Sequence, residues 1–350
     1  MRGGLARQTA QASTSVAANG SPQQVQPPRR NSIDRQQSTQ KVCTSSTMAP
    51  HPEQRAGKAK SSIVRSGTAK ARSKFTASLS PSVAPRTSVA VPKQLFDMHQ
   101  RELRRDRAAR LGSAQFLFER TFSDTLERVA IVKRRFRSAL LLGCPDQSWP
   151  KRLRELVDRV TVVDPGPRFA QVAGGFHATE DLDRLGERDF DLCVAIGTLD
   201  TVNDLPLALA NIAAALRSDS LLIGAISGGD TLPRLRTAMR AADAATGSAT
   251  PHVHPRIDGP SLCGLLTNAG FLSPVVDVDR VQAAYSSLES LIADLRSMAA
   301  TNILTDRPRT PFKRSAAGAA SASFNAAGKQ GRTVETFEIL HFAGWTPAEQ

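Results

Sequence analysis

The residues best placed to do chemistry are a glycine and an acid that end two apolar runs. The first run stops at Gly143, and the second, residues 161–164, ends on Asp164. Ligands of α/β sheets bind where parallel strands end, because helix N-termini and free backbone donors meet there. In nucleotide-binding sheets, an acid at the end of the second strand accepts both ribose hydroxyls. Gly143 and Asp164 therefore predict a nucleoside site, with the alternative that Asp164 only ends a strand and caps the turn after it.

Several other polar residues have both a functional and a local interpretation. Cys144 would be a reactive thiolate if a helix N-terminus lowered its pKa, but a buried structural thiol is the favoured interpretation. Asn203 and Asp204 either face a substrate or cap the helix that follows them. Asp230 has the same two interpretations. Sequence alone leaves these alternatives open.

The histidines give no metal site on their own. His252 and His254 are spaced so that a strand would place both imidazoles on one side. A metal site needs a third ligand, and no nearby carboxylate pattern supplies one. The four cysteines include no Cys-x-x-Cys pair. We therefore predict no metal.

These residues require a sheet whose strands alternate with helices. The predicted strands are 138–143, 160–164, one around His177, 190–196, 220–226, 271–278 and 333–343, and the predicted helices are 114–132, 148–159, 207–216, 228–243, 261–268 and 286–298. Repeated βα units with short links give one doubly wound sheet. The predicted fold class is α/β, a Rossmann-like seven-stranded sheet.

The chain divides by composition into a tail, a helical segment and the α/β domain. Residues 1–92 are rich in Ser, Ala, Gln and Arg, and we predict that they are disordered, because they bury too little apolar surface. This tail would be a transit peptide, a basic tail that touches acidic partners, or the product of a start codon assigned too far upstream; the last is favoured. Residues 93–137 form the N-terminal helical segment, and residues 138–347 form the α/β domain.

An arginine-rich stretch opens the helical segment. It contains Arg101, Arg104, Arg105, Arg107 and Arg110. One interpretation is a helix that docks on an acidic partner. The favoured one is a solvated helix whose acids pair locally with its arginines.

Charge and hydropathy narrow the classes of partner. The chain has 350 residues and a net charge of +14, but residues 1–90 hold 14 Lys or Arg against two acids. The remainder carries about +2, so the charge of this part does not support a basic nucleic-acid-binding face. No apolar run reaches the roughly 18 residues of a membrane span. We expect a soluble protein.

Short phrases in residues 95–347 resemble a known family. They are Phe96-Asp97 before the arginine-rich stretch, 202–206 (Val-Asn-Asp-Leu-Pro), 223–225 with 228–232, Pro251-His252, 294–296 with Met298 and Asn302, and 337–339 with Gly344-Trp345. Together with the order of Gly143, Asp164 and the strands, they resemble class I S-adenosyl-L-methionine-dependent methyltransferases. More narrowly, they resemble the mitochondrial complex I assembly factors that hydroxylate an arginine, with their alphaproteobacterial relatives.

The resemblance implies a cofactor and a substrate side. Residues Glu180 and Asp181 stand where the family contacts the adenine amine, and residues 197–199 would line the methionine side. The implied contacts to S-adenosyl-L-methionine are Gly143, Cys144, Asp146, Asp164, Pro165, Asp181, Gly197 and Thr198, and the implied substrate side is Asn203, Asp204, Gly229, Asp230 and His252.

The chain departs from the family in its first motif. The acid expected there is Leu141, and two of its three glycines are Pro145 and Gln147. Proline removes a backbone donor and fixes φ where glycine would approach the ligand. Asp146 would be the substitute for the lost acid. A polar-aromatic pair of the family is replaced by Asp200-Thr201.

Two functions follow from the resemblance. The first is a methyltransferase-family enzyme that acts on a protein substrate in complex I assembly, by methyl transfer or arginine hydroxylation. The second is a cofactor-free assembly or scaffold protein that kept the fold. Asp164 favours the enzyme, and the altered loop favours the scaffold. The expected location is the bacterial cytoplasm, or alternatively the mitochondrial matrix.

Overall fold

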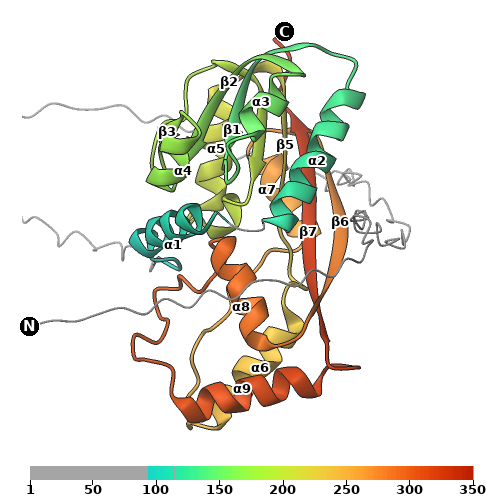
Figure 1. The fold of residues 1–350 in the computed structure, drawn as a ribbon. Helices are drawn as coiled ribbons and strands as arrows, with labels where there is room; N and C mark the ends of the chain where they lie inside the picture. The colour runs from blue at the N-terminus through green and yellow to red at the C-terminus, as the bar shows by residue number, and fades with distance from the viewer. Residues whose placement is uncertain (1–93, 113–114, 350) are drawn as a thin grey trace, which may run out of the picture. The chain divides into compact units, whose positions relative to one another are not determined.

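A computed structural model describes residues 94–112 and 115–349 of the chain (Figure 1). The tail predicted to be disordered lies outside these residues. Among them, no helix is long and apolar enough to cross a membrane.

The sheet has seven strands in the order β3-β2-β1-β4-β5-β7-β6. The first five in this order are parallel, and β7 runs antiparallel between β5 and β6. This is the order of class I methyltransferases, so the predicted fold class is confirmed. The strands are β1 (Phe136–Leu142), β2 (Val157–Asp164), β3 (Phe176–His177), β4 (Phe190–Ile196), β5 (Leu216–Ser227), β6 (Leu272–Tyr285) and β7 (Thr333–Trp345).

Helices cover both faces of this sheet, and a group of helices lies at the lower ends of β6 and β7 in Figure 1. They are α1 (Met98–Leu111), α2 (Phe116–Ile131), α3 (Trp149–Leu153), α4 (Pro167–Val172), the 3-10 helix η1 (Leu199–Thr201), α5 (Leu205–Ala215), α6 (Pro233–Ala244), α7 (Gly259–Asn268), α8 (Leu288–Ser297) and α9 (Arg314–Ala326). The helices α6, α8 and α9 form one group in Figure 1. They bury their apolar faces against one another and against β7.

Alternate residues of β1 build the two halves of the core. Leu140 and Leu142 face a cluster that includes Ile212 of α5 and Leu266 of α7. Leu141 faces the opposite cluster, with α2 and α3. A strand buried on both faces reads as a continuous apolar run, which explains why the sequence of β1 shows no alternation.

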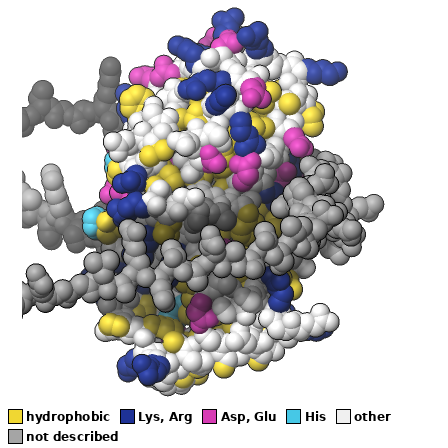
Figure 2. All heavy atoms as spheres, in the orientation of Figure 1, with side chains coloured by type: hydrophobic (Ala, Val, Ile, Leu, Met, Phe, Trp, Pro, Cys, Tyr) yellow, Lys and Arg dark blue, Asp and Glu magenta, His cyan; other side chains and the backbone are white. Residues whose placement is uncertain are grey.

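The surface mixes both signs of charge. Lys and Arg side chains are interspersed with Asp and Glu over the upper part of the face in Figure 2. No single-sign field is evident on that part.

Several sequence-based boundaries are wrong, among them the end of β6, which was predicted at residue 278 and lies at Tyr285, and the start of α6, which was predicted at residue 228 and lies at Pro233. The helix predicted from Ser148 to Arg159 ends at Leu153, because β2 begins at Val157, where that residue pairs with Phe136 of β1. Sheet pairing therefore overrides a local helical pattern. Helix α9 was not predicted, and its many small residues, Ala and Ser, give a weak apolar period.

Candidate ligand-binding edge

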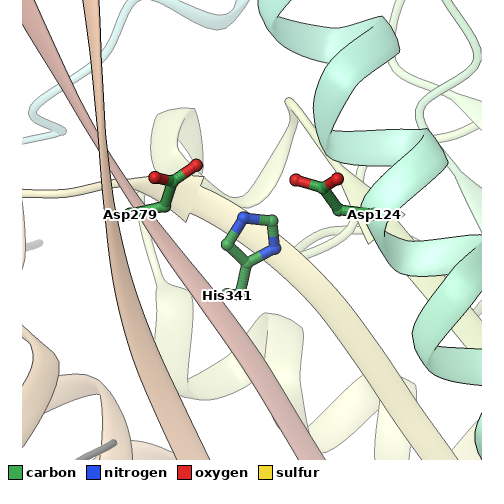
Figure 3. A group of neighbouring side chains, drawn as sticks. All are labelled: Asp124, Asp279 and His341. Atoms are coloured by element: carbon green, nitrogen blue, oxygen red, sulfur yellow. The ribbon is translucent and has the colours of Figure 1, made fainter. Parts of the chain in front are cut away.

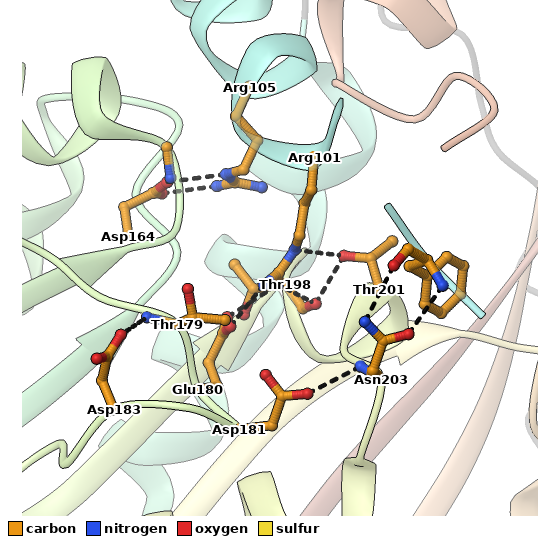
Figure 4. Close-up of polar contacts among 12 residues, drawn as sticks. Arg101, Arg105, Asp164, Thr179, Glu180, Asp181, Asp183, Thr198, Thr201 and Asn203 are labelled. Carbon is orange, nitrogen blue, oxygen red and sulfur yellow. Dashed lines mark hydrogen bonds and ion pairs between the residues drawn. The ribbon is translucent and has the colours of Figure 1, made fainter. Parts of the chain in front are cut away.

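The chemistry-bearing residues of the prediction meet at the carboxyl edge of the sheet. We define this edge by Gly143 after β1, Asp164 at the end of β2, Glu180 after β3, and Gly197 with Thr198 after β4. Helix α1 lies across it, and Figure 4 shows Arg101 and Arg105 of α1 directed at these strand ends.

Asp164 is fully buried, and both of its oxygens are occupied. Arg105 donates from Nε to Oδ1 at 2.8 Å and from Nη2 to Oδ2 at 2.6 Å. The backbone N–H groups of Cys144 and Gly166 donate to the same carboxylate at 2.8 and 2.7 Å. A fork-shaped guanidinium and two backbone donors thus satisfy the acid that the sequence assigns to ribose.

The second arginine of α1 makes an equivalent pair. Arg101 donates from Nη1 and Nη2 to the two oxygens of Glu180 at 2.8 and 3.1 Å. It also donates to the carbonyl oxygen of Thr198 at 2.8 Å and to the Thr201 hydroxyl at 3.0 Å. Arg105 likewise donates to the carbonyl of Gly197 at 3.0 Å. The two guanidiniums therefore bind the ends of β2 and β4 and the acid after β3.

Electrostatics hold Arg105 in its charged form. Burial acts to lower the pKa of its guanidinium, but the adjacent Asp164 carboxylate outweighs burial, and the pKa is raised above its ordinary value. The arginine side chains are 3% and 6% exposed, and their acids 1% and 0%. Both ion pairs are thus removed from water. Removal of one partner would leave a buried charge.

The solvated-helix interpretation of α1 is wrong. Its buried residues are Arg101, Arg105 and Ala108, and Arg101 and Arg105 pair with Glu180 and Asp164, which are distant in the chain, instead of with local acids. The alternative interpretation was a helix that docks on an acidic partner. The structure shows docking on acids, but these acids belong to the same chain. The sequence signal that could have revealed this is the i, i+4 spacing of Arg101 and Arg105, which places both on one helix face.

Asp181 binds the backbone of the segment that connects η1 to α5. Its Oδ2 accepts the backbone N–H groups of Asn203 and Asp204 at 2.9 and 3.0 Å. The Asn203 amide exchanges two hydrogen bonds with the backbone of Phe96, and Asp204 caps α5 through the N–H of Leu207. The local interpretation of Asn203 and Asp204 is therefore the one the structure supports.

Two glycines allow close packing at the edge. Gly143 has φ +82°, and a Cβ there would collide with the carbonyl oxygen of Ile196 in β4. A Cβ on Gly166 would come within 2.7 Å of Arg105 Cβ. Each glycine thus makes room for the chain itself, and Gly166 does so for α1.

A cavity of about 60 Å³ adjoins the two arginines of α1. Asp200 lines it and binds Arg256 at 2.5 Å and the Ser227 hydroxyl at 2.9 Å. Burial acts to raise the pKa of Asp200, but Arg256 lowers it below its usual value. Within the described residues, Arg256 Nε and Thr198 Oγ1 are buried without a hydrogen-bond partner. Arg256 lines the cavity, whereas Thr198 lies outside its lining, so the wall offers one unpaired polar atom, Arg256 Nε, beside the Asp200–Arg256 ion pair.

The histidines lie apart from one another and not on a strand. His252 binds Asp243 and Thr250, each at 2.9 Å. His254 accepts the N–H of Ile303 at 3.0 Å through Nε2. Burial, with Arg256 nearby, lowers the pKa of His254 to about 3, so the ring is neutral. The expectation that both imidazoles share one side of a strand is wrong.

Other predicted site residues have local roles. Cys144 is buried, and burial and the carboxylate of Asp164 raise the pKa of its thiol, so the structural interpretation holds. Asp146 is exposed and accepts the N–H of Ser148 at 2.7 Å. Pro165 is buried beside Asp164. Gly229 is exposed, and Asp230 binds Arg280 at 3.1 Å on the surface.

A separate polar cluster lies between α2 and the antiparallel strands. Asp124, Asp279 and His341 have ligand atoms within 4.8 Å of one another (Figure 3). Two carboxylates and an imidazole are a donor set that can hold a divalent ion. Arg120, at 3.1 Å from Asp279, already supplies a positive charge to the cluster. The prediction of no metal remains a prediction.

Comparison with known proteins identifies the family. No family model matches the chain. The zebrafish (Danio rerio) protein named arginine-hydroxylase NDUFAF5, mitochondrial, is 30% identical over 267 residues, which is 72% of this chain and 83% of the relative. The human protein of that name is 30% identical over 290 residues, 78% of this chain and 82% of the relative. The chain belongs to the NDUFAF5 family.

Part of the chain also resembles a methyltransferase. The malonyl-[acyl-carrier protein] O-methyltransferase of Laribacter hongkongensis is 33% identical over 166 residues, 45% of this chain and 54% of the relative. The NDUFAF5-family chain described here is therefore methyltransferase-like in both sequence and strand order.

The edge does not fit a nucleoside in the described conformation. Both oxygens of Asp164, where a ribose would bind, already accept from Arg105, and both oxygens of Glu180 accept from Arg101. The loop after Gly143 contributes the N–H of Cys144, which also points at Asp164. The residue types that a nucleoside needs are present, but α1 uses their polar atoms.

Proposed function

We propose that this chain is a methyltransferase-like enzyme of the NDUFAF5 family that takes S-adenosyl-L-methionine at the carboxyl edge and acts on a protein partner in complex I assembly. The observation that carries the proposal is the position of Asp164 at the end of β2, beside Gly143 and opposite the acids after β3. The mitochondrial names of the relatives support a mitochondrial matrix location, and the bacterial cytoplasm is the other compartment.

The substrate side of this proposal is the cavity beside Asp200 and Arg256. It lies next to the edge, and one of its lining residues, Arg256, has an Nε that no group of the described residues accepts. Among the described residues that line it there is no free general base, because Asp200 is paired and His254 accepts a backbone N–H. These residues would bind and orient a partner side chain.

A scaffold function is the second candidate. The observation that favours it is the pairing of Arg101 and Arg105 with Glu180 and Asp164, which occupies both oxygens of each of these acids and leaves only Oδ1 of the neighbouring Asp181 without a partner among the acids of the edge that the structure describes. A scaffold would use the fold as a rigid surface and keep α1 in place at all times.

Calorimetric titration of S-adenosyl-L-methionine into the full chain separates the two functions. The enzyme proposal expects saturable binding that Asp164→Ala abolishes while circular dichroism shows the variant folded. An absence of heat from the folded wild type and from variants with α1 released would contradict it. Mass spectrometry of partners after incubation would then detect a methyl group or an oxygen added to the protein substrate.

A further inference from the structure

We propose that α1 is an internal occupant of the carboxyl edge, so that α1 and S-adenosyl-L-methionine exclude each other. Arg101 and Arg105 are then the residues that set whether the edge is open. This inference rests on the proposed function, because it names what must leave before a cofactor binds.

The first support is that the arginines of α1 use both carboxylate oxygens of Asp164 and of Glu180. The pairs Arg105–Asp164 and Arg101–Glu180 are both bidentate and almost fully buried. Together with the contacts to the carbonyls of residues 197 and 198, they bind the ends of β2 and β4 and the acid after β3, which are the parts of the edge beyond the end of β1. A ribose and the Arg105 guanidinium would need the same carboxylate oxygens, so the two cannot be bound together.

The second support is that the interface between α1 and the rest of the domain is mostly polar. Only three residues of α1 are buried, and two of them are arginines. Its large apolar residues Leu103 and Leu111 are 44% and 52% exposed. Because α1 is held mainly by ion pairs and buries little apolar area, few dispersion contacts are lost when it leaves the edge. Water and ligand can then solvate the separated charges.

The third support is the contact of α1 with Gly166 and helix α4, which follow β2 in the chain. Arg105 lies over the Phe169 ring at 5.3 Å, and Asp106 accepts the N–H of Arg168 at 3.0 Å. Gly166 lies beneath Arg105, and its backbone (φ −102°, ψ 113°) is open to any residue. An alanine at 166 would therefore add no backbone strain; its Cβ would collide mainly with Arg105 Cβ, at 2.7 Å, and would also come within 3.1 Å of Asp164 Oδ1.

Two variants open the edge by different routes. Arg105→Ala removes the guanidinium that covers Asp164, whose carboxylate keeps the N–H donors of Cys144 and Gly166. Gly166→Ala leaves every charge in place and pushes α1 away. Arg107→Gln is the matched control, because Arg107 is an exposed arginine of the same helix.

The test is calorimetric titration of S-adenosyl-L-methionine into the full chain and these three variants, each checked for folding by circular dichroism. If the closed state dominates, opening raises the apparent affinity by the inverse of the open fraction. We expect at least a tenfold tighter Kd for Arg105→Ala and for Gly166→Ala, and an unchanged Kd for Arg107→Gln. Gly166→Ala carries the test if Arg105→Ala fails to fold.

The outcomes separate this inference from the function it rests on. Equal affinity in the wild type and both opening variants, or weaker binding in the variants, would overturn the exclusion of ligand by α1 and leave the proposed function standing. No binding by any folded form would overturn both.

Discussion

Two clusters of acids close to arginines, one at the carboxyl edge and one between α2 and the antiparallel strands, differ in how completely their charges are satisfied. At the carboxyl edge, Asp164 and Glu180 are at most 1% exposed in their side chains and are bound through both oxygens. Between α2 and the antiparallel strands, Asp124 and Asp279 are 36% and 32% exposed and share Arg120 at 3.9 and 3.1 Å. The first cluster holds one helix in place, and the second leaves its charges partly to water.

The comparison shows how burial changes the contribution of an ion pair to the stability of the fold. Exposed pairs contribute little, because water screens them and long side chains lose entropy. Buried pairs gain little over apolar packing, but they are costly to break one side at a time. The edge is therefore stable when closed and sensitive to any change in one partner.

The largest expected effect is at the edge. Asp164→Ala removes the partner of Arg105 and leaves the N–H groups of Cys144 and Gly166 without an acceptor. We expect a loss of about 3–5 kcal/mol in the free energy of unfolding. Urea denaturation followed by circular dichroism measures it. A loss below 1 kcal/mol would show that Arg105 and Asp164 do not form the buried pair described.

A double-mutant cycle sharpens this prediction. Arg105→Ala alone should destabilise less than Asp164→Ala, because Asp164 keeps two backbone donors. The double variant should lose less than the sum of the two single losses, because the pair is removed as a unit. Additive losses would contradict a direct interaction.

The acid dependence of stability tests the buried histidines near both clusters. Burial lowers the pKa of His254 to about 3 and that of His341 to about 4, against about 6.5 in the unfolded chain. Between pH 6.5 and 4 the unfolded state binds protons that the folded state does not, so the free energy of unfolding should fall as pH falls, by roughly 1 kcal/mol per pH unit for each group. Denaturation midpoints across this range measure the slope.

The variant His341→Leu measures the contribution of His341 to the pH dependence of the free energy of unfolding. His341→Leu removes one of the two groups without removing a hydrogen bond, because the structure gives its ring none within the described residues. The slope should be shallower in this variant than in the wild type. An unchanged slope would mean that His341 is accessible to protons in the folded chain.

The smallest expected effect is in the exposed cluster. Arg120→Ala removes a pair that is 38% and 32% exposed in its two side chains. We expect a change of at most about 1 kcal/mol in the free energy of unfolding, and less at high salt. A loss as large as that of Arg105→Ala would erase the contrast between the clusters.

The sequence predicts the central strands of the sheet well, because β1 and β4 are buried apolar runs. Residues 190–196 form β4 as predicted, and Asp164 ends β2 as predicted. The start of β2 was missed, because its first residues also fit a helical period and only pairing with β1 decides between the two. Local pattern fixes the type of most elements, and tertiary pairing fixes their ends.

The site could be predicted only in part. The acids at the strand ends follow from the fold, but their partners are 59 and 79 residues away in the chain. Local charge pattern in the arginine-rich stretch suggests a solvated helix, since nothing within one helical turn shows that Arg101 and Arg105 face acids of the sheet. The pairing of residues so far apart is a property of the folded chain.

The most direct test of the account is hydrogen exchange of the full chain with and without S-adenosylhomocysteine, the demethylated form of the cofactor, measured by mass spectrometry. The account predicts faster exchange in residues 98–111 and slower exchange around 143–146 and 164–166 when the ligand binds. Slower exchange in both regions would contradict it, because α1 would then close over the ligand instead of leaving the edge.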